Sequence, residues 1–156
     1  MSPNLMRNFE TRALTEGEIA LGRIVFADEI AWPRIRIFQG PALGFGAMVP
    51  LGRTIIFSRW RAARDFAHAG RDDQGWLVHE MMHLWQAARG IFLGGAKLKA
   101  LGAKAYAYTP KPAALLAAYN IESQAEIARH LFLARTGEGA KEAPPRAWLE
   151  EIWLSR

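Results

Sequence analysis

Two histidines and a glutamate in one short segment have the types and spacing that bind a metal ion. The segment His79-Glu80-Met81-Met82-His83 follows the HExxH pattern. On a helix, residues four positions apart lie on one face, so both imidazoles can reach the same cation, and Glu80 beside them can contact a water molecule on that cation. The pattern therefore predicts a metal site, with zinc as the expected ion.

A catalytic zinc ion takes three protein ligands and keeps its fourth position for water, so a third donor is needed. The 156 residues include no cysteine, which restricts this donor to His, Asp or Glu. Glu122 and Glu126 lie one turn apart on one face of an expected helix, and the apolar residues of that helix lie on a different side (Leu116, Ile121, Ile127 and Leu131). On this reasoning, either carboxylate could complete the site.

This combination resembles a known family, the minimal gluzincins, in which the HExxH helix is followed by a separate helix carrying Glu-x-x-Ala-Asp/Glu. The segment Glu122-Ser123-Gln124-Ala125-Glu126 matches that pattern with Glu in the last place. More narrowly, residues 79–86 and 119–127 resemble the small bacterial proteins described as Vgr-related, a metallopeptidase-like domain associated with contractile injection systems. A weaker likeness over residues 14–20 extends the resemblance to most of the chain.

The resemblance implies a role for each of these residues. His79, His83 and Glu122 would bind Zn2+, Glu80 would be the general base, and Glu126 would accept a hydrogen bond that orients a ligand histidine. The ion would lower the pKa of its water and polarise the scissile carbonyl, while Glu80 takes up the proton and returns it to the leaving amine. The expected function is a zinc-dependent metallopeptidase acting on a peptide or protein substrate. The alternative is a catalytically silent zinc-binding adaptor or cargo protein of a bacterial contractile injection (Vgr-type) system.

A metallopeptidase also needs a side chain that stabilises the developing oxyanion, and the sequence does not rank the candidates (Tyr106, Tyr108, Tyr119, His68 and His130). His130 follows Glu126 by one turn and is expected to be its i, i+4 partner rather than a fourth ligand. Four tryptophans are expected to be core or docking anchors (Trp60, Trp76, Trp85 and Trp148). The β-branched segment 53–57 could pair with an extended substrate as an edge strand, although a core strand is the favoured interpretation.

The spacing of apolar residues, together with capping and helix-breaking residues, predicts the helices and strands that would position these residues. Thr15 and Glu18 have the capping-box spacing and predict a helix over 15–28. Two strands and a short third strand are expected to form a small sheet (34–38, 53–57 and 46–49).

Three further helices are expected after this sheet. The motif helix would begin with Asp72 or Asp73 as its cap and run to Arg89, with Gly90 as its stop. A second helix over 113–136 would carry the acidic residues, and a short terminal helix would cover 148–153. The connection over 91–112 could include a strand at 104–108.

Length and composition indicate a single zincin-like domain over residues 1–156, of the α+β class, with a small N-terminal antiparallel or mixed sheet. The formal net charge is +5, but the basic residues are scattered and the cluster Arg59, Arg61 and Arg64 lacks an interleaved aromatic platform, so no nucleic-acid partner is expected. No run approaches the roughly 20 apolar residues of a membrane span, so no membrane partner is expected. Residues 1–18 contain no apolar signal segment, so the expected location is cytoplasmic, with export by a non-classical secretion system left open.

Overall fold

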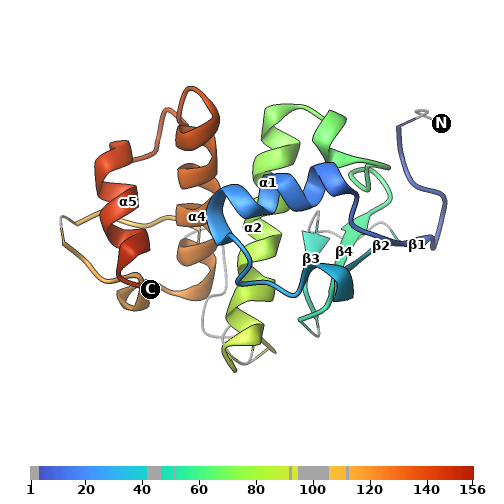
Figure 1. Ribbon diagram of the computed structural model, residues 1–156, viewed down its shortest axis with the longest axis horizontal. Coiled ribbons are helices and arrows are strands. Elements are labelled where there is room, and N and C mark those ends of the chain that lie inside the picture. Colours follow the sequence, from blue (N-terminus) through green and yellow to red (C-terminus); the bar gives the residue numbers. More distant parts are fainter. Residues whose placement is uncertain (1–3, 42–46, 51, 92, 95–105, 112) are drawn as a thin grey trace.

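The computed structural model describes residues 4–41, 47–50, 52–91, 93–94, 106–111 and 113–156. Over this part of the chain, the helices are α1 (Glu16–Phe26), α2 (Arg71–Ala88), α4 (Ile121–Thr136) and α5 (Arg146–Leu154), and the strands are β1 (Thr11–Ala13), β2 (Arg36–Gly40), β3 (Ala47–Met48) and β4 (Thr54–Ser58). The sheet lies on one side of α2, and α4 and α5 lie on the other (Figure 1). The predicted α+β class with a small sheet is therefore confirmed.

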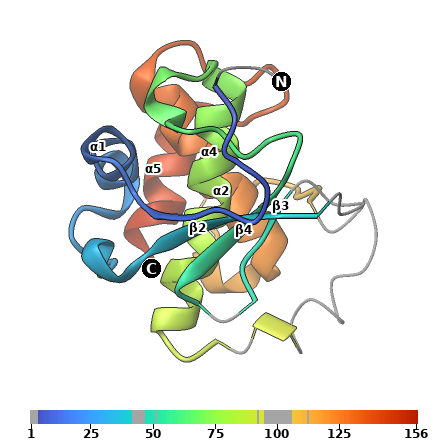
Figure 2. The ribbon, with the colours of Figure 1, turned by 90° about the vertical axis from the view of Figure 1, so that its right-hand side faces the viewer.

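The sheet has the order β1-β2-β4-β3 and is mixed. Strands β2 and β4 run parallel, whereas β1 pairs antiparallel with β2 and β3 pairs antiparallel with β4 (Figure 2). Strands β2, β3 and β4 agree with the prediction, but the three residues of β1 are too few for a periodic signal. Because β4 is paired on both sides, the interpretation of 53–57 as an edge strand for a substrate is wrong. Ile55 and Phe57 point into the core and are fully buried.

Helix α1 begins with the predicted capping box. The Thr15 hydroxyl accepts the N–H of Glu18, and the Glu18 carboxylate accepts the N–H of Thr15 at 2.8 Å. Glu18 also binds the Arg12 guanidinium through two contacts of 2.7 Å and the N–H of Phe66 at 2.9 Å, so this cap connects α1 to β1 and to the chain before α2. The helix ends two residues earlier than predicted, where Ala27 takes a φ of 49°.

Helix α2 passes through the middle of the fold, and its residues 77–86 are all buried. The predicted cap is wrong, because Gly70 is the N-cap and both Asp72 and Asp73 lie in the first turn. Carboxylates at that position stabilise the positive end of the helix dipole. Gly90, with a φ of 79°, follows the end of the helix as predicted. Helices α1 and α4 both pack against α2, so its imidazole-bearing face is as buried as its apolar face.

Helix α4 begins at Ile121 rather than at residue 113, because the Asn120 side chain caps it by accepting the N–H of Ser123 at 2.8 Å. The preceding Ala- and Leu-rich residues form a 3-10 helix, η4 (Leu116–Ala118), after Ala113 takes a φ of 59°. Gly137 follows α4 as predicted.

The end of the chain forms α5, in agreement with the predicted terminal helix, and buries Leu149, Ile152 and Trp153. Of the predicted strand at 104–108, residues 104–105 lie outside the described residues and 106–108 form no strand. None of the helices in the described ranges combines the length and the apolar composition needed to cross a membrane.

Candidate metal centre

Side chains from α2 and α4 converge on one point between the two helices. His79 and His83 from α2 and Glu122 from α4 each offer a ligand atom, and these atoms all lie within 4.8 Å of one another. The Nε2 atoms of both histidines lie 3.3 Å from the same oxygen of Glu122, Oε2. This geometry exists because α2 presents the histidines on successive turns toward the first turn of α4. The group could hold a metal ion.

These three side chains are almost inaccessible to solvent. His79 and His83 are each 1% exposed, and Glu122 is 6% exposed. Burial would raise the pKa of Glu122, but its contacts with His79 and His83 outweigh burial and hold this pKa well below its usual range. Burial would lower the pKa of His79, but its bonds to Glu122 and Glu126 raise it to about 9. Without a metal ion, the site is therefore held together by a proton between imidazole and carboxylates.

Glu126 contacts the other nitrogen of His79. Its Oε1 lies 2.7 Å from Nδ1 of His79, and its Oε2 accepts a bond from Arg129 at 3.1 Å. The carboxylate therefore faces the outer nitrogen of the imidazole, whose Nε2 is directed at Glu122. Burial would raise the pKa of Glu126, but the bond to His79 and the charge of Arg129 lower it.

Gln86 holds His83 in a corresponding way, although no pattern in the sequence predicts this role. Its Oε1 lies 2.8 Å from Nδ1 of His83, while its Nε2 donates to the carbonyl of Ile121 and to Oε1 of Gln124, both at 3.0 Å. Because the carbonyl of Ile121 can only accept, the amide orientation of Gln86 is fixed and Nδ1 of His83 carries the hydrogen. The other ring nitrogen of His83, Nε2, is thereby directed at Oε2 of Glu122.

Glu80 lies beside the two histidines in the sequence and is 2% exposed. Its Oε2 is buried and has no hydrogen-bond partner among the described residues. Buried carboxylate oxygens are rarely left without a partner, so this atom indicates a place for a water molecule or another donor. A set of two imidazoles and a carboxylate with a free carboxylate oxygen nearby fits a metal ion that keeps one open position.

Aromatic side chains surround His79. The Trp76 ring stacks on it with centroids 4.8 Å apart and planes 12° apart, and the Tyr106 ring lies 5.7 Å away. The other oxyanion candidates have different partners. The Tyr108 hydroxyl lies 2.6 Å from Nδ1 of His130, and His68 contacts Asp65 at 3.1 Å.

His130 lies 3.6 Å from Glu126, as expected for an i, i+4 partner. Among the tryptophans, Trp85 is buried and Trp76 and Trp148 are partly buried. Trp60 is 64% exposed, so it is not part of the core.

Comparison with known proteins identifies one relationship in both sequence and structure. No model of a known protein family matches the chain. The chain is 35% identical over 147 residues to the type VI secretion system spike protein VgrG2b of Pseudomonas aeruginosa, an alignment that covers 86% of this chain and 14% of the spike protein. It also matches the structure of the effector domain of Pseudomonas aeruginosa VgrG2b with a TM-score of 0.71 and 29% identity, over 99% of this chain and 88% of that one.

The chain is thus homologous to the VgrG2b effector domain, and it matches about 14% of the length of the spike protein. The predicted resemblance to Vgr-related proteins is confirmed.

Proposed function

Starting from this homology, we propose that the chain is a bacterial secretion-system effector domain that hydrolyses peptide bonds with a zinc ion. His79, His83 and Glu122 would bind the ion, and Glu80 would be the general base. The observation that carries the proposal is the convergence of three ligand atoms within 4.8 Å next to a buried, unpartnered oxygen of Glu80. The relative is described as a type VI secretion spike protein, so delivery by such a machine is part of the proposal.

The donor set supports zinc over harder cations. Two imidazoles and one carboxylate are typical zinc ligands, whereas Mg2+ and Ca2+ prefer sites made of oxygen atoms alone. Three protein ligands also leave one coordination position open, as catalytic zinc requires. When bound, zinc would supply an activated water molecule and polarise a carbonyl group.

The side chains of this domain would transfer the proton and orient the ligand histidines. Glu80 would accept a proton from water and donate it to the departing amine, since its Oε2 has no competing partner among the described residues. Glu126 would keep Nε2 of His79 directed at the ion by accepting a hydrogen bond from Nδ1 of that histidine. Gln86 would do the same for His83. Both imidazoles are then held in the orientation that a ligand needs.

Metal analysis and a cleavage assay test this proposal together. The purified protein should contain one zinc ion per chain and cleave an unfolded protein such as casein. Glu80→Gln should keep the zinc and lose about 100-fold or more of the cleavage rate, because the general base is gone. Glu122→Ala should lose both zinc and cleavage. Full zinc content in Glu122→Ala would contradict the proposed ligand set.

A second candidate function is a zinc-binding cargo protein without catalysis. The deep burial of the centre favours it, because ligands that are 1% and 6% exposed leave a substrate little access. In that case zinc would contribute folding free energy only. Glu80→Gln would then match the original protein in every assay, while removal of zinc would lower the melting temperature of both.

A further inference from the structure

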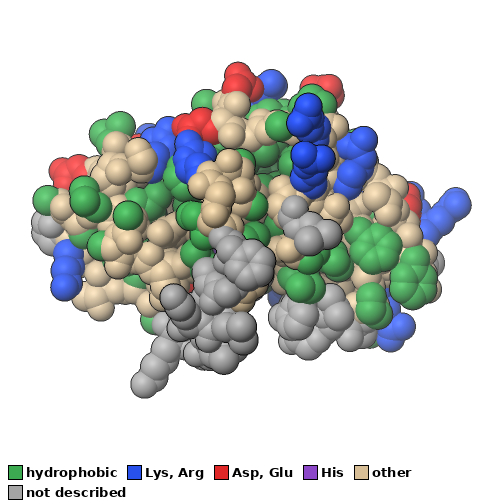
Figure 3. All heavy atoms as spheres, turned by 90° about the horizontal axis from the view of Figure 1, so that it is seen from below, with side chains coloured by type: hydrophobic (Ala, Val, Ile, Leu, Met, Phe, Trp, Pro, Cys, Tyr) green, Lys and Arg blue, Asp and Glu red, His purple; other side chains and the backbone are tan. Residues whose placement is uncertain are grey.

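The basic residues of the surface do not mark a binding site. On the face of the molecule drawn in Figure 3, Lys and Arg side chains lie in several separate groups among hydrophobic ones. Trp60 lies between Arg59 and Arg61 in the sequence, and its ring centroid is 4.2 Å from the Arg59 guanidinium. The expectation that this arginine cluster lacks an interleaved aromatic side chain is therefore wrong. A single ring is not the series of stacking side chains that binds a nucleic-acid strand, so this surface selects no particular ligand.

Among the five candidates for stabilising the oxyanion, Tyr106 is the one that contacts a proposed metal ligand in the described part of the chain. Its ring centroid lies 5.7 Å from that of His79. Tyr106 is 41% exposed whereas His79 is 1% exposed, so Tyr106 reaches from the surface to the buried centre. A substrate that approaches the centre on this side meets Tyr106 first.

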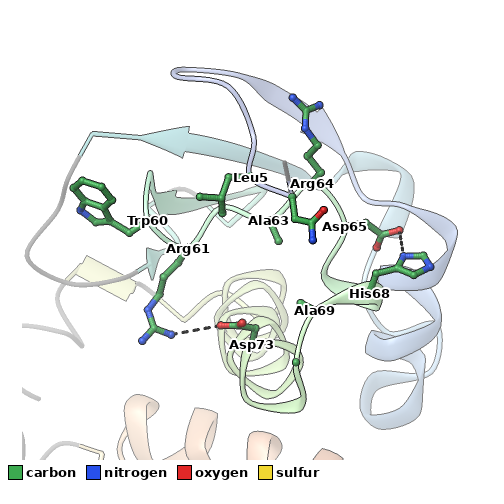
Figure 4. Close-up of a pocket in the computed structure, with 11 residues that line it drawn as sticks. Leu5, Trp60, Arg61, Ala63, Arg64, Asp65, His68, Ala69 and Asp73 are labelled. Atoms are coloured by element: carbon green, nitrogen blue, oxygen red, sulfur yellow. Dashed lines mark hydrogen bonds and ion pairs between the residues drawn. The ribbon is translucent and has the colours of Figure 1, made fainter. Parts of the chain in front are cut away.

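His68 lies away from the centre, just before the beginning of α2. It lines a cavity of about 470 Å³, and none of the described residues that line this cavity belongs to the metal centre. Figure 4 shows its imidazole directed at Asp65, with Nδ1 and Oδ2 3.1 Å apart. His68 is therefore not placed to contact a substrate at the metal centre.

The other candidates have their own partners. The Tyr108 hydroxyl lies 2.6 Å from Nδ1 of His130. Burial and the charge of Glu126 raise the pKa of this hydroxyl, so it stays protonated and donates the bond. The Tyr119 hydroxyl accepts the N–H of Lys111 at 3.3 Å. Within the described ranges, none of these three candidates contacts a proposed metal ligand.

The hydroxyl of Tyr106 is available as a donor. No residue of the described ranges forms a hydrogen bond with it. Burial raises its pKa, and so do the charges of Glu122, Glu80 and Glu126, so the hydroxyl is protonated at neutral pH. It also lies within electrostatic range of the carboxylate that would bind the ion and of the one that would be the general base.

The chain around Tyr106 is anchored to α4. Oγ of Ser123 donates to the carbonyl of Ala107, the next residue, at 3.3 Å. Tyr108, two residues after Tyr106, bonds to His130 on the same helix. A donor that is held in place before the substrate arrives stabilises a developing charge at little cost in reorganisation.

We infer that Tyr106 stabilises the developing oxyanion, by donating a hydrogen bond from its hydroxyl to the oxygen of the scissile carbonyl. The hydroxyl keeps its proton throughout. Tyr108 would be a positioning residue that holds Tyr106 in place through His130. The role in a reaction rests on the proposed peptidase function, but the contact between Tyr106 and an oxygen ligand at the metal centre does not require turnover.

Binding of acetohydroxamate tests this contact without catalysis. This small anion binds metal ions through two oxygen atoms, one of which takes the place of a substrate carbonyl oxygen. The full chain is loaded with Co2+ instead of zinc, and binding is followed through the visible absorption spectrum of the Co2+. Tyr106→Phe should keep the Co2+ and bind acetohydroxamate about 10-fold more weakly, because it lacks a hydrogen bond to a charged ligand. In the casein assay the same substitution should lower kcat and leave KM nearly unchanged, since the bond forms in the transition state.

Two further variants separate contact from positioning. Tyr119→Phe is the matched control, because it loses the same hydroxyl at a half-buried position and should bind acetohydroxamate as the original protein does. Tyr108→Phe should weaken binding by about 3-fold in the original protein and have no effect in the Tyr106→Phe background, because it acts through Tyr106. The same loss in both backgrounds would show that Tyr108 has a structural role alone.

Equal affinity in Tyr106→Phe and the original protein, or an equal loss in Tyr119→Phe, would overturn the inference. Failure of the Co2+-loaded original protein to bind acetohydroxamate would also overturn it. If the original protein bound neither Co2+ nor zinc, the metal site would be refuted and the inference with it. If Tyr106→Phe showed the expected loss of binding but the zinc-loaded original protein did not cleave casein, the peptidase function would be refuted and the contact made by Tyr106 would stand.

Discussion

Gln86 fixes the orientation of His83. The distance from Oε1 of Gln86 to Nδ1 of His83 is 2.8 Å, and the amide nitrogen of Gln86 is tied to the carbonyl of Ile121 on the neighbouring helix. The side chain therefore joins the beginning of α4 to the end of the motif on α2. It holds one imidazole as Glu126 holds the other, but without a charge.

Replacing Gln86 should weaken metal binding. In Gln86→Leu the Nδ1–H of His83 loses its acceptor, so we expect zinc affinity to fall by about 10-fold or more, measured by competition with a chromophoric chelator. Gln74→Leu is the control, because Gln74 on the same helix bonds only to the carbonyls of Ala67 and Ala69. Unchanged affinity in Gln86→Leu would show that the orientation of His83 does not depend on this bond.

Zinc binding should release a proton. The pKa of His79 is raised to about 9 because the bonds to Glu122 and Glu126 outweigh burial, so its imidazole is protonated in the metal-free protein at pH 7. An ion that binds Nε2 must displace that proton, and affinity should rise with pH up to about 9. Calorimetric titration in buffers of different ionisation enthalpy should show about one proton released per zinc ion at pH 7. Buffer-independent heats would contradict this account.

Glu29 should make folding sensitive to acid. Burial would raise the pKa of Glu29, but bonds from Arg156, Trp85 and Arg89 outweigh it and lower this pKa to about 2. The stabilisation is complete above pH 4.5, the ordinary value, and is lost as the pH falls toward 2.

Glu29→Gln should therefore lower the free energy of unfolding at pH 7 by about 1 to 2 kcal/mol and flatten its decline below pH 4.5. Urea denaturation at pH 7, 4 and 3, followed by tryptophan fluorescence, measures both effects. Glu151→Gln, at an exposed position of α5, should behave as the original protein. If the free energy of unfolding of Glu29→Gln fell as steeply with pH as that of the original protein, other carboxylates would be the cause of the acid sensitivity.

Gly22 should tolerate no side chain. It is buried in α1, and a Cβ atom there would lie 2.8 Å from Cζ3 of Trp32 and 2.9 Å from Sδ of Met81 on α2. Gly22→Ala should cost about 1 to 3 kcal/mol of stability because both neighbours would have to move. Gly139→Ala is the control, since its Cβ would meet only Ala134, at an ordinary 3.8 Å. Thermal melting of the two variants should therefore differ by several degrees.

The motif residues could be predicted from the sequence because their relationship is local. His79 and His83 share a helical face by spacing alone, and the capping box of α1 and the glycines that end α2 and α4 are also recognised from neighbouring residues. Only the family resemblance favours Glu122 over Glu126 as the ligand, since both lie on one helical face. The structure brings Glu122 to both Nε2 atoms and Glu126 to the Nδ1 of His79.

Other features depend on contacts distant in sequence, which no local pattern reveals. Gln86 acts through Ile121 and Gln124, more than 30 residues away. The start of α4 is decided by the cap at Asn120, although the preceding Ala-rich residues have high helix propensity. Trp60 is exposed because the chain turns directly after β4, whereas composition alone favours burial of tryptophan.

The burial of residues 77–86 on every side of α2 has a consequence for how the protein opens. Amide hydrogens in such a segment exchange with solvent only when the whole domain unfolds, since no local fraying exposes them. The proposed metal ligands His79 and His83 therefore belong to the most persistent part of the molecule. A destabilising substitution anywhere in the core would shorten the time for which an intact site exists, even when it touches none of the ligands.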